Sequence, residues 1–214
     1  MTFEFDALLF DLDGTLVNSL AAVDRAWTAL CDRHRLDASF VVPQIHGRRS
    51  IDSIRLILPH VDAEAEDQWL QDREATDTEG VFALEGAAEF LYSLECPWAI
   101  VTSGTSNVAN PRIRAGGLPM PRVAVYGEDV KNGKPSPGPY LLGAQRLGIA
   151  PERCLFFEDT LAGIRSAHAA NMKSIGIASS LSAEQISEAD AVINDYKNLS
   201  VLPQDGAYTL TIPH

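Results

Sequence analysis

Short apolar runs alternate with longer amphipathic segments along most of the chain. Such runs are typical of strands that are buried on both faces, and they predict strands at residues 7–11, 98–102, 123–126, 154–157, 174–178 and 191–193. Helical periodicity in the intervening segments predicts helices at residues 87–94, 139–147, 161–170 and 183–188. This alternation indicates an α/β fold in which helices cover both faces of a parallel sheet.

Two stretches depart from this alternation. Residues 18–82 have apolar positions at helical spacing and polar or acidic faces between them, which predicts a helical domain inserted into a core of residues 1–17 and 83–214. The apolar positions that carry this periodicity are Val23, Trp27, Leu30, Ile51, Ile54 and Leu58. Near the end of the chain, alternating residues on either side of Asp205-Gly206 predict a structural hairpin.

Composition narrows the class of protein. With 214 residues, of which 46% are hydrophobic and 21% charged, the chain can bury the core of an ordinary soluble protein. Its net charge of −12 opposes binding to nucleic acid or to an anionic membrane, so we expect neither as a partner. The three cysteines, Cys31, Cys96 and Cys154, are widely spaced without a metal-binding pattern, as is typical of reduced thiols.

The first residues are acidic and lack the basic and apolar segments of a signal peptide. No apolar run approaches the roughly 20 residues that span a bilayer. We therefore expect a cytoplasmic protein, and nothing in the sequence calls for more than a monomer.

Two aspartates at the end of the first predicted strand are the first candidates for chemistry. Asp11 and Asp13, in Asp11-Leu12-Asp13-Gly14-Thr15, would point the same way, roughly 7 Å apart along an extended strand. Two like charges there repel each other and lose hydration, a cost that a bound cation offsets, and carboxylate oxygens favour Mg²⁺. One carboxylate could attack a substrate while the other transfers protons. The alternative is an aspartate–glycine turn with an N-cap.

Polar residues also follow two other predicted strands, and α/β proteins bind ligands at the carboxyl ends of such strands. Thr102, Ser103 and Gly104 could hold a phosphate oxygen through hydroxyl and main-chain N–H groups, or they could form a turn that caps the next helix. Glu158 and Asp159 form a second acidic pair. Asp159 could serve as an N-cap, but a cap does not require Glu158, so the two acidic pairs together indicate one shared cation site.

Lys134 lies between these positions in the sequence, in Gly133-Lys134-Pro135. The proline disfavours helical geometry at Lys134 and stiffens the loop. An ammonium group held beside a carboxylate–metal site could neutralise phosphoryl charge and steady a nucleophile, whereas a lone lysine in an acidic protein is usually a solvated charge. Its place between the two acidic segments favours the first interpretation.

In their order and spacing, these segments resemble the four motifs of the haloacid dehalogenase superfamily. The motifs are Asp11-Leu12-Asp13-Gly14-Thr15, Val101-Thr102-Ser103-Gly104, Gly133-Lys134-Pro135 and Glu158-Asp159-Thr160-Leu161-Ala162-Gly163-Ile164. The insertion at residues 18–82 looks like the small helical cap of the β-phosphoglucomutase-like branch. Ile45-His46-Gly47-Arg48 and the run at residues 98–104 look like the bacterial hexose and hexitol phosphatases of that branch. The resemblance, which spans about residues 5–195, implies a Rossmann-like core with a cap.

The resemblance also implies a magnesium-dependent phosphatase for small sugar or sugar-alcohol phosphates that works through an aspartyl-phosphate. In such an enzyme Asp11 would be the nucleophile, and Asp13 would protonate the leaving alcohol and then activate water. The implied Mg²⁺ ligands are Asp11, Asp13 through its main-chain carbonyl, Asp159 and Glu158, the last directly or through water.

The same resemblance implies the groups that bind the substrate. Ser103, the N–H of Gly104 and Lys134 would stabilise the transferring phosphoryl group, with Thr102 in place of Ser103 if the alignment slips by one residue. In the loop between the cap helices, Gly47 and Arg48 are the candidates for selecting the substrate, more than the neighbouring His46 and Arg49. A solvated pair of arginines is the alternative there.

Other activities on this fold are open. Mutases of the branch carry a histidine on the first cap helix, and the corresponding position here is Val23, which argues against a phosphomutase. A phosphatase for phosphoglycolate or glycerol phosphate shares the core motifs. A non-catalytic binding protein on this fold would be expected to lose Asp11 or Asp13, and both are present.

Overall fold

The structure is a computed structural model that describes residues 1–204 and 206–213. Its strands are β1 (Thr2–Phe5), β2 (Ala7–Phe10), β3 (Val17–Asn18), β4 (Phe82–Ala83), β5 (Trp98–Val101), β6 (Ala124–Val125), β7 (Cys154–Glu158), β8 (Lys173–Ile177), β9 (Ala191–Ile193), β10 (Ser200–Gln204) and β11 (Ala207–Thr211). Its α-helices are α1 (Leu20–His34), α2 (Ala38–Val41), α3 (Ser50–Ile57), α4 (Ala63–Thr76), α5 (Ala87–Ser93), α6 (Ser106–Ala115), α7 (Gly138–Leu147) and α8 (Leu161–Ala169). Short 3₁₀ helices are η1 (Val42–Gln44), η2 (Gly127–Asp129) and η3 (Pro151–Arg153).

A six-stranded sheet in the order β6-β5-β2-β7-β8-β9 forms the centre of the molecule, and every neighbouring pair in it is parallel. These strands confirm the six that the sequence predicts. Phe10, the last residue of β2, pairs with Ile100 of β5 and Phe157 of β7. The residues that follow these strands therefore emerge side by side at one edge of the sheet.

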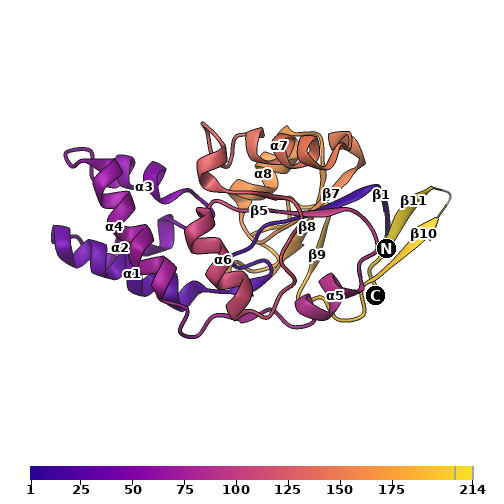
Figure 1. The fold of residues 1–214 in the computed structure, drawn as a ribbon, viewed down its shortest axis with the longest axis horizontal. Coiled ribbons are helices and arrows are strands. Elements are labelled where there is room, and N and C mark those ends of the chain that lie inside the picture. Colours follow the sequence, from indigo (N-terminus) through magenta and orange to yellow (C-terminus); the bar gives the residue numbers. More distant parts are fainter. Residues whose placement is uncertain (205, 214) are drawn as a thin grey trace.

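Helices cover both faces of this sheet (Figure 1), as predicted. Side chains alternate along β2, so Leu8 and Phe10 pack on the face of α5 and α6, while Ala7 and Leu9 pack on the face of α7 and α8. All four residues are fully buried, which is why the strand reads as an unbroken apolar run. The architecture is an α/β, Rossmann-like fold.

The predicted helices at residues 87–94, 139–147 and 161–170 are confirmed as α5, α7 and α8. The predicted helix at residues 183–188 is wrong, because this segment forms turns. Its local hydrogen bonds include a helix-like one, from the Ile186 N–H to the Ser182 carbonyl, and side-chain bonds between Ser182 and Gln185. Ile186 is the only buried residue of the segment, too little burial to stabilise so short a helix.

Residues 18–82 carry helices α1 to α4, which lie at the left in Figure 1, and we name this segment the cap. The cap has its own hydrophobic core, to which the predicted positions contribute: Val23, Trp27, Leu30 and Ile54 are buried, and Ile51 and Leu58 are partly buried against them. The chain enters the cap through β3 and leaves it through β4, and these two strands pair antiparallel. The two connections to the core therefore form one ribbon.

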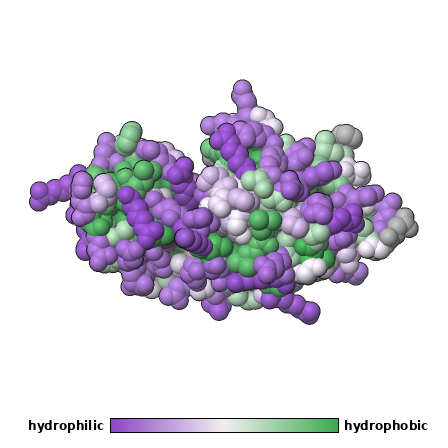
Figure 2. All heavy atoms as spheres, turned by 90° about the horizontal axis from the view of Figure 1, so that it is seen from above, coloured by the Kyte–Doolittle hydropathy of each residue, from purple (hydrophilic) through white to green (hydrophobic). Residues whose placement is uncertain are grey.

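The predicted hairpin near the end of the chain is confirmed as β10 and β11, although Asp205 of its predicted turn lies outside the described residues. The sequence analysis missed β1, which pairs with β11 to complete a three-stranded sheet. Hydrophilic residues cover most of the face shown in Figure 2, with hydrophobic ones in separate patches. No helix in the described part of the chain combines the length and apolar character of a membrane span.

Candidate active site

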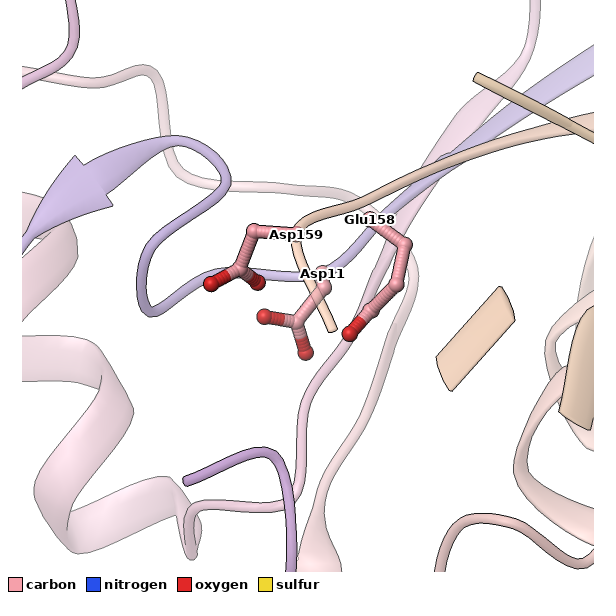
Figure 3. A group of neighbouring side chains, drawn as sticks. All are labelled: Asp11, Glu158 and Asp159. Atoms are coloured by element: carbon pink, nitrogen blue, oxygen red, sulfur yellow. The ribbon is translucent and has the colours of Figure 1, made fainter. Parts of the chain in front are cut away.

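Three predicted carboxylates converge at the carboxyl edge of the central sheet. Asp11, Glu158 and Asp159 each place a carboxylate oxygen within 4.8 Å of the other two, and all three residues are buried (Figure 3). Asp11 directly follows β2, Glu158 ends the neighbouring β7, and the N–H of Asp11 donates to the Phe157 carbonyl at 3.0 Å. Pairing of the two strands thus brings together groups that lie almost 150 residues apart in the sequence.

The N-cap alternative for Asp159 is wrong. The N-cap of α8 is Thr160, whose hydroxyl accepts from the N–H of Gly163 at 3.2 Å. The Asp159 carboxylate instead accepts from the Thr15 hydroxyl at 3.0 Å, and Glu158 accepts from both the N–H and the hydroxyl of Thr160. Both carboxylates are therefore held beside Asp11 and are not used to begin the helix.

Two glycines leave room for these carboxylates. A methyl group built on Gly14 would lie 2.1 Å from Oδ2 of Asp159, and one built on Gly163 would lie 2.0 Å from the carboxyl carbon of Glu158. Gly14 also has a φ of +81°, a conformation that side chains with a Cβ rarely adopt. The two glycines are thus part of the cradle around the carboxylates.

Lys134 is the cation that this cluster shares. Its ammonium group donates to Oδ1 of Asp11 at 2.5 Å and to Oε2 of Glu158 at 2.9 Å, and the side chain is buried above the ring of Tyr140. Burial opposes a charged lysine, but the two carboxylates outweigh it and raise the pKa of Lys134. The Tyr140 hydroxyl also donates to Glu158, at 3.3 Å.

One ammonium group does not balance three buried carboxylates. Burial raises the pKa of Asp11 well above its usual range, the Lys134 charge opposes this rise, and the Glu158 and Asp159 charges add to it. Burial, followed by the Glu158 charge, raises the pKa of Asp159 to about 7. Closely spaced buried oxygen ligands with excess negative charge fit a hard divalent cation such as Mg²⁺.

The Asp13 carboxylate does not join this cluster. Its Oδ1 accepts from the Ser19 hydroxyl at 2.6 Å and from Nη1 of Arg112, on α6, at 2.9 Å. Nη2 of the same guanidinium donates to Glu74, on the cap helix α4, at 3.1 Å. Burial raises the pKa of Glu74 although the Arg112 charge opposes the rise.

The sequence analysis missed Arg112 and Glu74, yet each leaves a signal. Arg112 follows Val108 by four residues and precedes Ile113, so it lies on the buried stripe of α6. Glu74 follows Leu70 by four residues on the buried stripe of α4. A charged residue on the apolar face of a helix indicates a buried partner, because an unpaired charge there is costly.

The residues after β5 have separate tasks. Thr102 is buried, and its hydroxyl accepts from the N–H of Gly104 at 3.1 Å, so it shapes the turn. The half-buried Ser103 points its hydroxyl to the cap, where it donates to the Gly47 carbonyl at 3.0 Å. Both residues line the cavity between cap and core, and the Ser103 hydroxyl is the one that contacts the cap.

The predicted cap residues lie at the same junction. Gly47 has a φ of +75°, and a methyl group built on it would lie 2.6 Å from the Thr160 hydroxyl oxygen, so only glycine permits this approach. Arg48 is exposed, and within residues 1–204 and 206–213 its guanidinium has no hydrogen-bond or ion-pair partner. The Arg49 guanidinium is instead held by Asp52 and donates to core carbonyls, among them Val130 at 2.7 Å and Lys131 at 3.0 Å.

A cavity lies between cap and core, above the carboxylates. The cavity touches the predicted residues Asp11, Asp13, Asp159, Ser103, Gly104, Gly47 and Arg48, but Lys134 and Glu158 lie beneath its floor. The cap also contributes Val23, Trp27 and His46. Burial lowers the pKa of His46. The arrangement can hold a small anionic substrate with one end on the acidic cluster and the other under the cap.

A family model of haloacid dehalogenase-like hydrolases matches residues 5–171, which include all four motifs of this site. The chain belongs to the haloacid dehalogenase-like hydrolase family. Hydrolases of this family generally use Mg²⁺, in agreement with the donor set of the acidic cluster.

Relatives of this hydrolase cover nearly the whole chain. It is 45% identical to hexitol phosphatase A of Escherichia coli (strain K12), over 92% of this chain and 94% of that protein. It is 32% identical to 2-deoxyglucose-6-phosphate phosphatase 1 of Saccharomyces cerevisiae, over 94% and 92% of the two chains. Its fold is similar to that of β-phosphoglucomutase from Clostridium difficile, with a TM-score of 0.77 at 21% identity over 92% of this chain and 93% of that one.

Proposed function

We propose that this hydrolase is a magnesium-dependent phosphatase that cleaves small sugar or sugar-alcohol phosphates through an aspartyl-phosphate on Asp11. The observation that carries the proposal is the convergence of Asp11, Glu158 and Asp159 on one buried position beside Lys134. The printed activities of the relatives, a hexitol phosphatase and a 2-deoxyglucose-6-phosphate phosphatase, support this substrate class.

The proposed ligands of Mg²⁺ are the carboxylates of Asp11, Glu158 and Asp159 and the main-chain carbonyl of Asp13. When bound, the ion would offset the excess negative charge of the cluster and polarise a phosphoryl oxygen. The chain's own contribution is to hold the nucleophile: Lys134 fixes Oδ1 of Asp11 and limits rotation of the carboxylate.

In the first half-reaction, a carboxylate oxygen of Asp11 attacks phosphorus and the ester P–O bond breaks. Asp13 donates its proton to the departing alcohol, and phosphate is left as an acyl phosphate on Asp11. In the second half-reaction, Asp13 takes a proton from water as the water oxygen attacks phosphorus. The acyl phosphate P–O bond then breaks, which releases inorganic phosphate and regenerates Asp11.

The remaining candidates bind the substrate in this scheme. Ser103, the N–H of Gly104 and Lys134 stabilise the phosphoryl group, and Gly47 and Arg48 meet the organic part under the cap. We assign the cap to residues 18–82 and the core to residues 1–17 and 83–214, so that cap and core together exclude water during the reaction. Binding of the substrate then requires the Ser103 hydroxyl to leave the Gly47 carbonyl and donate to phosphate.

A phosphomutase would need to return phosphate to the sugar in preference to water. Val23, at the position where the mutases of the branch carry a histidine, lines the cavity and cannot exchange a proton. This observation favours transfer of the phosphoryl group to water.

A panel of phosphate esters tests the proposal. The purified protein, with Mg²⁺ or with a chelator, is incubated with hexitol phosphates, hexose 6-phosphates, glycerol phosphate and phosphoglycolate. Released phosphate is measured and the sugar products are checked for isomerisation. We expect Mg²⁺-dependent release that is fastest for the hexitol or hexose phosphates.

Asp11→Asn should lower this release by about 10³-fold or more, because an amide is a poor nucleophile. The matched control is Asp6→Asn, at the other end of β2, where the carboxylate pairs with Arg153 at the surface; its turnover should not change. Full turnover by Asp11→Asn would exclude Asp11 as the nucleophile. Isomerised sugar without net phosphate would indicate a mutase, and a preference for phosphoglycolate or glycerol phosphate would change the substrate class.

A further inference from the structure

A buried arginine connects the cap to the aspartate that transfers protons in the proposed reaction. Arg112 is only 2% exposed, and its guanidinium bridges two carboxylates, with Nη1 on Asp13 and Nη2 on Glu74. Asp13 belongs to the core, whereas Glu74 belongs to α4 of the cap, which packs against α6. Asp13, Glu74 and Arg112 all line the same cavity.

The two oxygens of Asp13 have different surroundings. Oδ1 accepts from both Ser19 and Arg112, so it is fixed from two directions. Oδ2 is the oxygen nearer the phosphate-binding turn, since a methyl group built on Gly104 would lie 3.9 Å from it. With Oδ1 held, Oδ2 is the atom that can reach the leaving oxygen of a substrate.

Glu74 in turn holds the other arm of the guanidinium. A planar guanidinium can donate to two carboxylates at once in fixed directions, which a lysine ammonium cannot do with the same geometry. Because Glu74 lies on the cap helix α4, the direction of Arg112, and through it that of Asp13, is set in part by the position of the cap on the core.

We infer that Arg112 is a positioning residue that aims Asp13 at the leaving group, and that Glu74 makes this aim depend on cap closure. The inference rests on the proposed phosphatase reaction, in which Asp13 is the general acid. Arg112 itself transfers no proton and forms no bond to phosphorus. Its effect is confined to steps in which Asp13 protonates or deprotonates a reactant.

Aryl phosphates with leaving groups of graded acidity test this inference. A dinitrophenolate leaves without protonation, whereas a phenolate needs a proton from the general acid. The quantity to compare is kcat/KM, because it reports formation of the aspartyl-phosphate and is independent of the later hydrolysis step. Aryl groups also lack the hydroxyls of a sugar, so they remove any direct contact between Arg112 and a sugar.

We expect Arg112→Met to lower kcat/KM for phenyl phosphate by about 10²-fold and for 2,4-dinitrophenyl phosphate by less than about 5-fold. Glu74→Gln should lower kcat/KM for phenyl phosphate by roughly 10-fold, again more than for the dinitrophenyl ester, because it weakens only the contact of Nη2 and leaves Nη1 on Asp13. Arg112→Lys should restore part of the phenyl phosphate activity. The matched control is Arg114→Met, on the exposed face of the same helix, which should leave the whole series unchanged.

If Arg112→Met fails to fold, Glu74→Gln and Ser19→Ala carry the test, because each removes one contact of the chain Glu74–Arg112–Asp13–Ser19. A drop that is equal across the aryl series in these folded variants would overturn the inference and leave Arg112 a structural residue. Loss on sugar phosphates with an unchanged aryl series would also overturn it and make Arg112 a substrate contact. Absence of any phosphatase activity in the wild type would instead refute the proposed function.

Discussion

The core wall and the cap wall of the cavity are held by different kinds of interaction. The core wall is formed by Asp11 and Asp159 at adjacent strand ends, with Glu158 beneath them. Within the core, Asp11 and Glu158 pair with Lys134, and Asp159 accepts from the Thr15 hydroxyl. The cap wall is carried by helices and meets the core through separate polar contacts: Glu74 to Arg112, Gln71 to Thr105, the Gly47 carbonyl to Ser103, and Arg49 to core carbonyls. The sheet therefore holds the acidic cluster in place, while a few polar side chains hold the cap against the core.

This difference predicts different consequences of mutation. Loss of the Lys134 charge leaves the buried carboxylates Asp11 and Glu158 without their ion-pair partner, which lowers both stability and activity. Loss of a contact in the cap wall leaves each part folded and changes only how often the cavity is closed. The predictions that follow test this division in order of expected size.

Lys134→Met should have the largest effect, because it leaves two buried carboxylates, Asp11 and Glu158, without their ammonium partner. We expect a loss of about 3–5 kcal/mol in the free energy of unfolding without metal, and little remaining phosphatase activity. Urea unfolding in the presence of a chelator measures the first quantity. The matched control is Lys197→Met, which removes an exposed pair with Glu85 and should change the free energy by less than about 1 kcal/mol. Equal effects of the two variants would contradict the division.

Arg49→Ala should act on closure. It removes donors to the Val130 and Lys131 carbonyls of the core and leaves the acidic cluster untouched. Hydrogen bonds from a charged donor contribute about 1.5–3 kcal/mol each, so kcat/KM for a sugar phosphate should fall by about 10- to 100-fold with little change in the unfolding midpoint.

X-ray scattering in solution should show a larger radius of gyration for Arg49→Ala than for wild type. The control is Arg55→Ala, on α3, the cap helix that Arg49 precedes; its exposed pair with Glu64 lies within the cap. A compact variant with normal kinetics would show that Arg49 does not hold the cap.

Arg48→Ala should have a narrower effect than its neighbour. The Arg48 side chain lines the cavity without a partner in the described part of the chain, so its charge is available to the substrate. We expect KM for sugar phosphates to rise by about 10-fold and aryl phosphate turnover to change by less than about 2-fold. Equal losses on both substrates would make Arg48 structural.

The smallest expected effect is the change of Mg²⁺ affinity with pH. The pKa of Asp159 is about 7 in the folded, metal-free protein and 3.8 in its ordinary state, so below pH 7 a proton competes with Mg²⁺ for this carboxylate. From pH 8 to pH 6 the affinity for Mg²⁺ should fall by roughly 10-fold, about 1.4 kcal/mol. With Mg²⁺ well above its dissociation constant at both pH values, the rise in Tm on adding Mg²⁺ should therefore be about 3–6 °C larger at pH 8. Asp159→Asn should reduce this difference to the part that comes from Asp11, whose pKa is also raised; an unchanged pH dependence in that variant would assign it to other groups.

The core wall could be predicted from the sequence, and the physical reason is visible at Asp11. A carboxylate directly after a fully apolar run needs a cation or a hydrogen-bond donor beside it, so residues 7–11 predict both a strand and a functional site. Glu158 and Asp159 repeat the pattern. Carboxylates that follow apolar strands are easy to recognise in the sequence. Parallel strands end at the same edge of the sheet, so the meeting of these carboxylates follows from the fold class alone.

The contacts between cap and core could not be predicted in the same way. Arg112 and Glu74 are charged residues on helices, where a solvated position is the usual expectation, and only the packing of α4 on α6 buries them together. Helix α6 itself was missed because Pro111 and several polar residues obscure its apolar stripe. Tertiary packing also explains the helix that was wrongly predicted at residues 183–188. The weak helical pattern there has almost nothing to pack against, and the segment forms turns.

The ribbon of β3 and β4 restricts how the cap can move relative to the core. Two separate connections could each bend at a different place, but here Val17 pairs with Ala83 and Asn18 with Phe82, so we expect the two connections to bend together. The end of α6 packs closely against this ribbon, since a methyl group built on Gly116 would lie 2.7 Å from the Val17 side chain. We therefore expect the cap to move about this ribbon as one hinge, against which the end of the helix that bears Arg112 packs.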